Sequence, residues 1–334
     1  MEQTLRITPP RCRLIINADD LGVSPERDAG ILDCFAQGAI SSASLLVDGE
    51  HAAKAAQGAV DAGLPLGLHL NLTEGQRPQG STLTGTDGAL LGKFGLREAL
   101  AATRVGDTDV AHEIRRQFDR FIALTGELPS HVDGHHHIHV EPAIAAVLAP
   151  IMACEYGVYC VRLPRERRLT ELSGDVDFEA AFQHDVVRAA QAAEAVFAAA
   201  AVYGTDHFLG QSLMGNRLQA DRVGALLSEL QAEANGETWV ELMVHPGVLS
   251  TDPASSAFCR SPARAHETRM LQSAAWQVAT ADWELGSYRD LPRRETDSRP
   301  RLLIYSKLTP ATGNAETARR YAAALSAVAQ VRFR

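Results

Sequence analysis

The sequence predicts an α/β protein, built either as a barrel of parallel strands or as a related open parallel sheet. Short apolar segments alternate with helical patterns along most of the chain, which is the order expected when helices connect parallel strands. Four of the apolar segments end in aspartate, histidine or both. Because functional residues of such folds gather at the carboxyl ends of the strands, we expect these side chains to share one site.

The first third of the chain shows this alternation most clearly. We expect strands over 13–18, 43–47 and 66–72, with helices over 24–37 and 51–62 between them. In the first helix Ser24 can cap the amino terminus and Pro25 suits the first turn. Ile31, Leu32 and Phe35 give that helix one apolar face, which predicts packing against a sheet.

The rest of the chain continues the pattern less regularly. We expect helices over 109–124, 141–152 and 264–279. We expect strands over 129–132, 159–163 and 238–244, and a mainly helical region over 165–237. A stretch rich in proline and arginine follows at 291–300, and the last residues read as strand, glycine-containing loop, helix and strand. The prediction is one domain over 1–290, a linker over 291–300 and an extension over 301–334.

Composition and charge exclude several classes of protein. Hydrophobic residues make up 46% of the 334 residues and charged residues 22%, as in a soluble globular protein. The formal net charge of −9 argues against nucleic acid as a partner, because phosphate binding needs a basic face.

Cysteine usage and apolar stretches bear on the cellular compartment. The five cysteines form no CxxC pair, so the sequence signals neither a disulfide framework nor a thiolate zinc site. The first residues contain no apolar core of a signal peptide. Gln191 and Glu194 interrupt the longest apolar stretch, 189–203, which is too short to span a bilayer. We therefore expect no membrane span and a cytoplasmic protein.

Asp19 and Asp20 stand at the end of the first predicted strand. Adjacent side chains on a strand point to opposite faces, but a bend at the strand's end lets both reach one pocket. The pair can supply one metal ligand and one group for proton transfer. Its alternative role is to cap the following helix.

Histidines mark three further strand ends. His69 lies within LGLHLNL, where a single histidine is commonly a core residue unless other ligands meet it. The segment HVDGHHHIHV, 131–140, holds five histidines around Asp133, and a carboxylate there can fix the tautomer of a ligating imidazole. His245 follows an apolar strand and precedes a Pro-Gly turn.

Together these residue types indicate a site with one aspartate and two histidines as ligands of a divalent ion. A second aspartate can act as general base and a third histidine as general acid. A metal in such a site lowers the pKa of bound water and polarises a carbonyl, which suits amide hydrolysis. Two histidines and one aspartate favour zinc on chemical grounds.

The motifs ADDLG, LGLHLNL, HVDGHHHIH and HPG resemble, in order, those of the YdjC-like carbohydrate deacetylases, the group that includes chito-oligosaccharide deacetylases. The likeness runs from about residue 13 to LGSYRDL at 285–291. It implies a modified (β/α) barrel of parallel strands, frequently a homodimer. The implied reaction removes the N-acetyl group from an N-acetylated sugar, with magnesium also possible as the metal.

The same resemblance assigns roles to individual residues. It implies that the metal ligands are Asp20, His69 and His135. Asp19 becomes the general base and His245 the general acid. Arg162, in VRLP, matches a basic position near the family's pocket and is carried over as a substrate-binding residue, although a surface position at a strand end fits it equally.

The end of the chain departs from the family pattern. Residues 301–334 resemble the first β-α-β unit of a nucleotide-sugar glycosyltransferase, but such a unit is too short to bind a nucleotide alone. An extension that packs on the barrel is an equal alternative. For the whole protein, two other functions stay open: a metal-dependent phosphoesterase, and a catalytically silent carbohydrate-binding protein on the same barrel.

Overall fold

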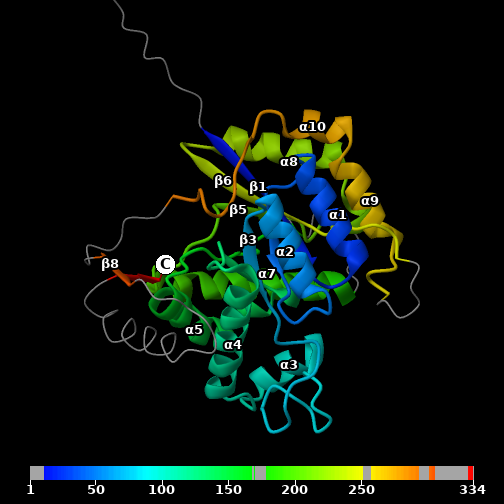
Figure 1. Ribbon diagram of the computed structural model, residues 1–334. Coiled ribbons are helices and arrows are strands. Elements are labelled where there is room, and N and C mark those ends of the chain that lie inside the picture. Colours follow the sequence, from blue (N-terminus) through cyan, green and yellow to red (C-terminus); the bar gives the residue numbers. More distant parts are fainter. Residues whose placement is uncertain are drawn as a thin grey trace, which may run out of the picture.

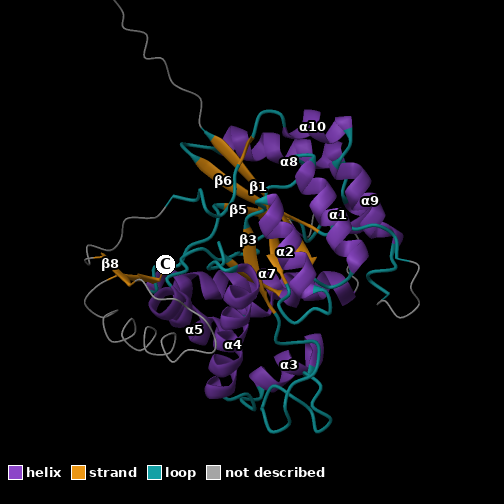
Figure 2. Cartoon of the chain, in the orientation of Figure 1, coloured by secondary structure: helices purple, strands orange, loops and turns teal. Residues whose placement is uncertain are grey.

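The computed structural model describes residues 11–167, 169, 178–250, 257–292, 301–304 and 330–333. Figures 1 and 2 show a central group of strands with helices packed around it. The strands are β1 (Cys12–Leu21), β2 (Ser42–Leu45), β3 (Leu66–Leu70), β4 (Val132–Gly134), β5 (His207–Leu209), β6 (Thr238–Val244) and β7 (Glu284–Leu285). Strands of the predicted type are therefore present at the four ends where the candidate residues lie.

These strands form one parallel sheet in the order β4-β3-β2-β1-β6-β5. β1 is long enough to pair along one side with all of β6, and along the other with β7 at its beginning and β2 near its end. Since every pair is parallel, the carboxyl ends of β1, β3, β4 and β6 lie at the same edge. The α/β prediction is confirmed.

The sheet curls beyond its two outer strands. A bridge joins Val132 of β4 to Val161, and a second joins Cys160 to Tyr203, just before β5. The Val161 N–H donates to the Tyr203 carbonyl at 3.0 Å, and the Arg162 N–H donates to the Val132 carbonyl at 3.0 Å. These contacts bring the two edges towards one another, as the predicted modified barrel requires.

The strand predicted at 159–163 forms only these single bridges. Pro164 follows directly and has no N–H to donate, so it cannot prolong the pairing.

Helices cover the outside of the sheet. They are α1 (Pro25–Ala36), α2 (Ala52–Ala62), α3 (Gly92–Ala101), α4 (Asp107–Thr125), α5 (Pro142–Pro150), α7 (Phe178–Ala199), α8 (Ala220–Glu233), α9 (Pro262–Leu271) and α10 (Ala274–Thr280). A 3₁₀ helix, η1 (His135–Val140), follows β4, a π-helical turn, η2 (Ile151–Tyr156), follows α5, and a short 3₁₀ turn, η3 (Gly215–Arg217), precedes α8. None of the helices in the described part of the chain is long and apolar enough to cross a membrane.

Two helix predictions have different outcomes. Ser24 caps α1 as predicted, and its side chain accepts a hydrogen bond from the Arg27 N–H at 3.3 Å. The single helix predicted at 264–279 is wrong, because the chain there forms α9 and α10. Ser273 separates them, and its hydroxyl oxygen accepts from the Trp276 N–H at 3.1 Å, which starts a new helix.

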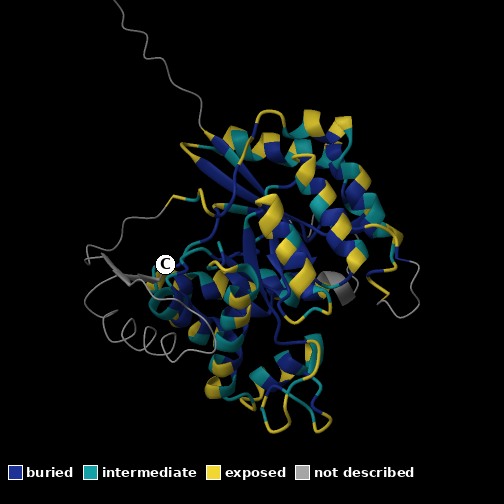
Figure 3. Cartoon of the chain, viewed as in Figure 1, coloured by how far each residue is buried: buried dark blue, intermediate teal, exposed yellow. Residues whose placement is uncertain are grey.

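The core lies between the strands and the surrounding helices, where Figure 3 shows the strands in dark blue. Leu14, Ile16, Leu68 and Val240 are fully buried, as is Phe118 of α4. Burial of each such side chain contributes about 1.5–3 kcal/mol, so the strands that carry the candidate site are anchored by the core.

The carboxyl-terminal strands β8 (Arg301–Ile304) and β9 (Gln330–Phe333) pair with each other in parallel as a separate two-stranded sheet. The helix predicted between them and the linker at 293–300 lie outside the described residues.

Candidate active site

The end of β1 bends so that two adjacent aspartates serve one site. Asp20 has a φ of 69°, and the pairing of β1 with β2 shifts between Ala18 and Leu21. A non-glycine residue rarely adopts this left-handed conformation, so the bend stores strain. The Asp28 carboxylate supports the turn by accepting the Gly22 N–H at 2.6 Å. Asp19 and Asp20 are both buried at the sheet edge, as the bend predicted for a strand end allows.

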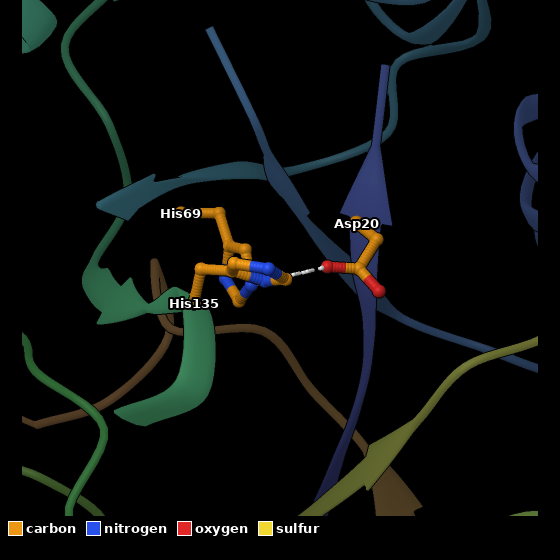
Figure 4. A group of neighbouring side chains, drawn as sticks. All are labelled: Asp20, His69 and His135. Atoms are coloured by element: carbon orange, nitrogen blue, oxygen red, sulfur yellow. Dashed lines mark ion pairs between the residues drawn. The ribbon is translucent and has the colours of Figure 1, made fainter. Parts of the chain in front are cut away.

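Asp20, His69 and His135 converge from three strand ends, and we call them the ligand triad (Figure 4). Asp20 Oδ1 lies 3.3 Å from His69 Nε2 and 3.3 Å from His135 Nδ1. All three donor atoms lie within 4.8 Å of one another. Burial opposes ionisation of Asp20, but hydrogen bonds from His135 and His69 outweigh it and hold the pKa of Asp20 well below its usual range.

Asp133 orients one of these imidazoles. Its Oδ1 lies 2.8 Å from His69 Nδ1, which leaves His69 Nε2 facing Asp20. Ser44 donates to the other carboxylate oxygen at 2.5 Å. Burial lowers the pKa of His69, but the charge of Asp133 and its hydrogen bond outweigh this and raise it to about 10. A carboxylate behind a ligating histidine is the usual partner of a metal-bound imidazole.

The triad fits a divalent metal ion. One carboxylate and two imidazoles from different strands are a common donor set for catalytic metal sites that keep open positions. Within the triad Asp20 and His69 are buried, whereas the His135 side chain is 16% exposed. The donor atoms thus face one another at an edge that ligands can approach.

Asp19 has a different partner. Arg162 donates to it through both terminal nitrogens, Nη1 and Nη2, at 2.6 Å each. The same guanidinium donates through Nε to Glu241 at 2.8 Å and lies 3.1 Å from Asp133. We call these four residues the Arg162 cluster. A bidentate arginine holds a carboxylate in one orientation, so the position of Asp19 is fixed.

The placement of Arg162 differs from the predicted contact with substrate. Its exposed fraction is 0%, and its guanidinium is occupied by carboxylates beneath the site. It is not a surface residue either. The structure therefore gives Arg162 the task of positioning Asp19 and neutralising buried acids, because a buried carboxylate needs a paired cation.

His245 comes from the end of β6 and closes the other side of the site. Its Nε2 lies 3.9 Å from Asp19 Oδ2. Its main chain is held at both ends, because the His245 N–H donates to Glu267 and the carbonyl accepts from Arg27 at 2.9 Å. Burial and the nearby Arg264 hold the pKa of His245 well below its usual range. The imidazole is therefore neutral at pH 7 in the free protein.

Only one of the five histidines at 131–140 joins the triad. His131 stacks on the Tyr288 ring with centroids 3.9 Å apart, and His139 Nε2 lies 3.0 Å from the Arg162 carbonyl. His136 and His137 adopt left-handed φ values of 54° and 55°, and the His136 ring lies beside that of His135 with centroids 4.0 Å apart. Of the consecutive residues His135, His136 and His137, only His135 lies within ion-pair distance of Asp20.

Sequence reasoning missed several residues that support the site. Glu74 Oε2 lies 3.2 Å from His135 Nε2, and Glu241, Glu267 and Arg27 hold Arg162 or His245. Glu241 had one available signal, since it is an acid in the middle of the apolar strand TWVELMV. The other three carry no local pattern, because their partners are distant in the chain.

A parallel α/β barrel that gathers two aspartates and three histidines at one end of its strands has the architecture of a hydrolase. The sequence profile of the YdjC-like protein family matches residues 13–282 of this chain. The chain belongs to the YdjC-like family, and the resemblance drawn from its motifs is confirmed.

Curated relatives support this membership. The chain is 42% identical to the human protein named carbohydrate deacetylase, over 78% of this chain and 85% of that one. It is 41% identical to the mouse protein of the same name, over 78% and 88%. The chitooligosaccharide deacetylase of Serratia marcescens is 32% identical, over 83% and 98%.

A solved structure shares the fold. It belongs to a protein of Enterococcus faecalis V583 that is provisionally assigned to cellobiose-phosphate cleavage. The TM-score is 0.63 at 22% sequence identity, and the match covers 84% of this chain and 99% of that one.

Proposed function

We propose that this protein is a carbohydrate deacetylase that hydrolyses the N-acetyl group of an N-acetylated sugar with the help of one divalent metal ion. The observation that carries the proposal is the convergence of Asp20, His69 and His135, with Asp19 and His245 beside them. The names of the human, mouse and Serratia relatives support the substrate class.

The metal, magnesium or zinc, would be held by the ligand triad. When bound, such an ion lowers the pKa of water and polarises the amide carbonyl. Asp133 keeps His69 in the tautomer that presents Nε2 to the ion, and Glu74 stands behind His135 in a comparable way.

Asp19 and His245 carry the proton transfers in this proposal. Asp19 is fixed by Arg162 and accepts the proton of the attacking water. In this proposal His245, whose Nε2 lies 3.9 Å from Asp19 Oδ2, passes a proton on to the leaving amine. Since His245 is neutral in the free protein, we propose that it receives this proton during the reaction, with Asp19 as the nearest source.

A phosphoesterase needs a basic group that holds phosphate, and Arg162 is the candidate that lies near the sequence motifs. That guanidinium is taken up by carboxylates, so the structure offers this alternative less support than deacetylation. A silent carbohydrate-binding protein would not need Asp19 to be held so firmly by Arg162.

An acetate-release screen tests the proposal. Purified protein, loaded separately with magnesium and with zinc, is incubated with N-acetylhexosamines, chito-oligosaccharides and phosphate monoesters. We expect acetate from at least one N-acetylated sugar and loss of release with chelator. Phosphate release without acetate would support the phosphoesterase, and binding without either product would support the silent protein.

The other predictions from the sequence enter here as proposals. We propose that 1–290 is the catalytic domain and that the extension 301–334 is dispensable for the reaction. Removing 301–334 should leave the kcat for acetate release within about twofold of the full chain, because none of the proposed site residues lies in the extension. Loss of activity with the fold preserved would show that the extension helps to build the site.

Homodimerisation and a cytoplasmic location stay predictions. Sedimentation tests the first, and cell fractionation tests the second.

A further inference from the structure

Exposed apolar side chains gather beside His245. In the described part of the chain seven large apolar residues are exposed, namely Val60, Phe94, Val248, Leu249, Phe258, Val278 and Leu285. Val248 and Leu249 follow His245 in the chain by three and four residues, and Phe258 contacts its imidazole. Exposed apolar groups at the mouth of a site are a common mark of ligand binding.

Phe258 is partly exposed, and its ring is held by neighbouring side chains. It is 42% exposed, and its ring meets the His245 ring edge-on at 87° with centroids 5.7 Å apart. The guanidinium carbons of Arg27 and Arg264 lie 4.9 and 4.3 Å from its centroid. Both arginines are buried, so cation–π contacts hold the ring from the inside while part of it faces solvent.

The position of Phe258 relates it to the substrate of the proposed reaction. The scissile amide has to lie between the ligand triad and His245, because those groups act on its two ends. The group attached to the amide nitrogen therefore leaves the site on the side of His245, next to the Phe258 ring. In an N-acetylated sugar that group is a pyranose ring, whose C–H faces are apolar and pack well on an aromatic surface.

We propose that Phe258 is a sugar-binding platform on which the apolar face of the N-acetylated pyranose ring packs. The inference rests on the proposed function. It assigns Phe258 to substrate affinity and leaves the proton transfers to Asp19 and His245. Val248 and Leu249 extend the apolar surface that follows the strand.

The test measures affinity and turnover separately, with the chitin disaccharide diacetylchitobiose as probe. In the wild-type background, Phe258→Ala should raise KM about tenfold and change kcat less than about threefold, as expected for loss of one aromatic contact. In an Asp19→Asn background, which binds but turns over slowly, calorimetry should show a Kd about tenfold weaker. Phe258→Trp should keep the affinity, and Phe258→Leu, which retains apolar area without the ring, should lose most of it.

Leu285→Ala is the matched control. Leu285 is 41% exposed and lies on β7, which pairs with the beginning of β1 at the opposite end of the strands. This variant should leave KM and Kd unchanged.

Other outcomes would overturn the proposal. A fall in kcat with unchanged KM and Kd would mean that the ring only positions His245. Unchanged kinetics with a change in sedimentation would make this surface an interface between protein chains.

Failure of the proposed function is distinguishable. If the wild-type protein releases no acetate but the Asp19→Asn protein binds the disaccharide through Phe258, the platform stands and the deacetylase proposal fails. If the Asp19→Asn protein does not bind and the wild type releases no acetate, both fail.

Discussion

Asp19 and Asp20 are neighbours on one strand, yet their carboxylates have different surroundings. Asp19 is held by a guanidinium at 2.6 Å in the Arg162 cluster, whereas the ion pairs of Asp20 within the described residues are with two imidazoles at 3.3 Å. In the first case the chain supplies a permanent cation. In the second it supplies imidazoles that, in the proposed function, would release their protons when a metal binds. Arg162 therefore fixes Asp19 permanently, whereas the cation beside Asp20, the proposed metal ion, would be exchangeable.

The largest expected effect removes a ligand from the triad. His135→Ala takes away one of three donors, so we expect metal affinity to fall by more than the roughly 10–100-fold seen when only an outer partner is lost. His137→Ala is the control, because His137 lies outside the triad, and should retain the metal. Elemental analysis after dialysis measures both. Equal retention in the two variants would contradict the assignment of the triad.

The next effect separates proton transfer from metal binding. Asp19→Asn and His245→Ala should each keep the metal but lower kcat by roughly a hundredfold or more, the usual scale for proton-transfer groups. His245→Ala should also remove one limb of the pH–rate profile. His266→Ala, which removes a histidine that contacts Leu218, should leave kcat unchanged. Near-normal rates in the first two variants, with metal occupancy confirmed, would refute the assigned roles.

Arg162→Lys tests whether Arg162 fixes the position of Asp19 for the reaction. Lysine cannot hold Asp19 with two parallel hydrogen bonds. We expect kcat to fall about 10–100-fold with KM nearly unchanged, because a misplaced base affects the chemical step. A raised KM with normal kcat would instead restore the role in substrate binding that the resemblance implies. Steady-state kinetics distinguish the two, with thermal unfolding as a check on the fold.

The smallest effect concerns Asp28, whose side chain supports the turn after Asp20. Burial raises the pKa of Asp28 from 3.8 to about 6, against the hydrogen bond from Gly22. Because its folded-state pKa is raised, protonated Asp28 stabilises the folded protein fully below pH 3.8. This contribution to the free energy of unfolding, about 3 kcal/mol, is lost as the pH rises through 6. Asp28→Asn keeps an acceptor oxygen for the Gly22 N–H without the charge.

Urea unfolding of the wild type and Asp28→Asn at several pH values measures this term. The wild type should lose stability relative to the variant between about pH 4 and pH 6.5. A difference that does not change with pH would show that Asp28 is not protonated in the folded protein.

Much of the fold was predictable because local patterns and packing agree. The segment at 13–18 has apolar residues on both faces, Leu14 and Ile16 on one and Ile15 on the other, as a central parallel strand requires, and Ser24 and Pro25 start α1 as expected. The prediction at 159–163 was less accurate, because a strand also needs paired neighbours, and in this segment only Cys160 and Val161 form a bridge, one each. Apolar runs indicate burial, but the extent of pairing depends on the other strands.

The sequence by itself determined the chemistry of this protein: acids and histidines at the ends of four strands, and the family to which the chain belongs. It did so because parallel strands deliver their carboxyl ends to one edge, whatever the details of packing. Tertiary structure alone decided which groups are partners. Arg162 is 143 residues from Asp19 and Arg27 is 218 from His245, so no local pattern reveals those contacts. Burial makes such pairing necessary, because a charged group that leaves water must be matched by a group of opposite charge or by hydrogen bonds.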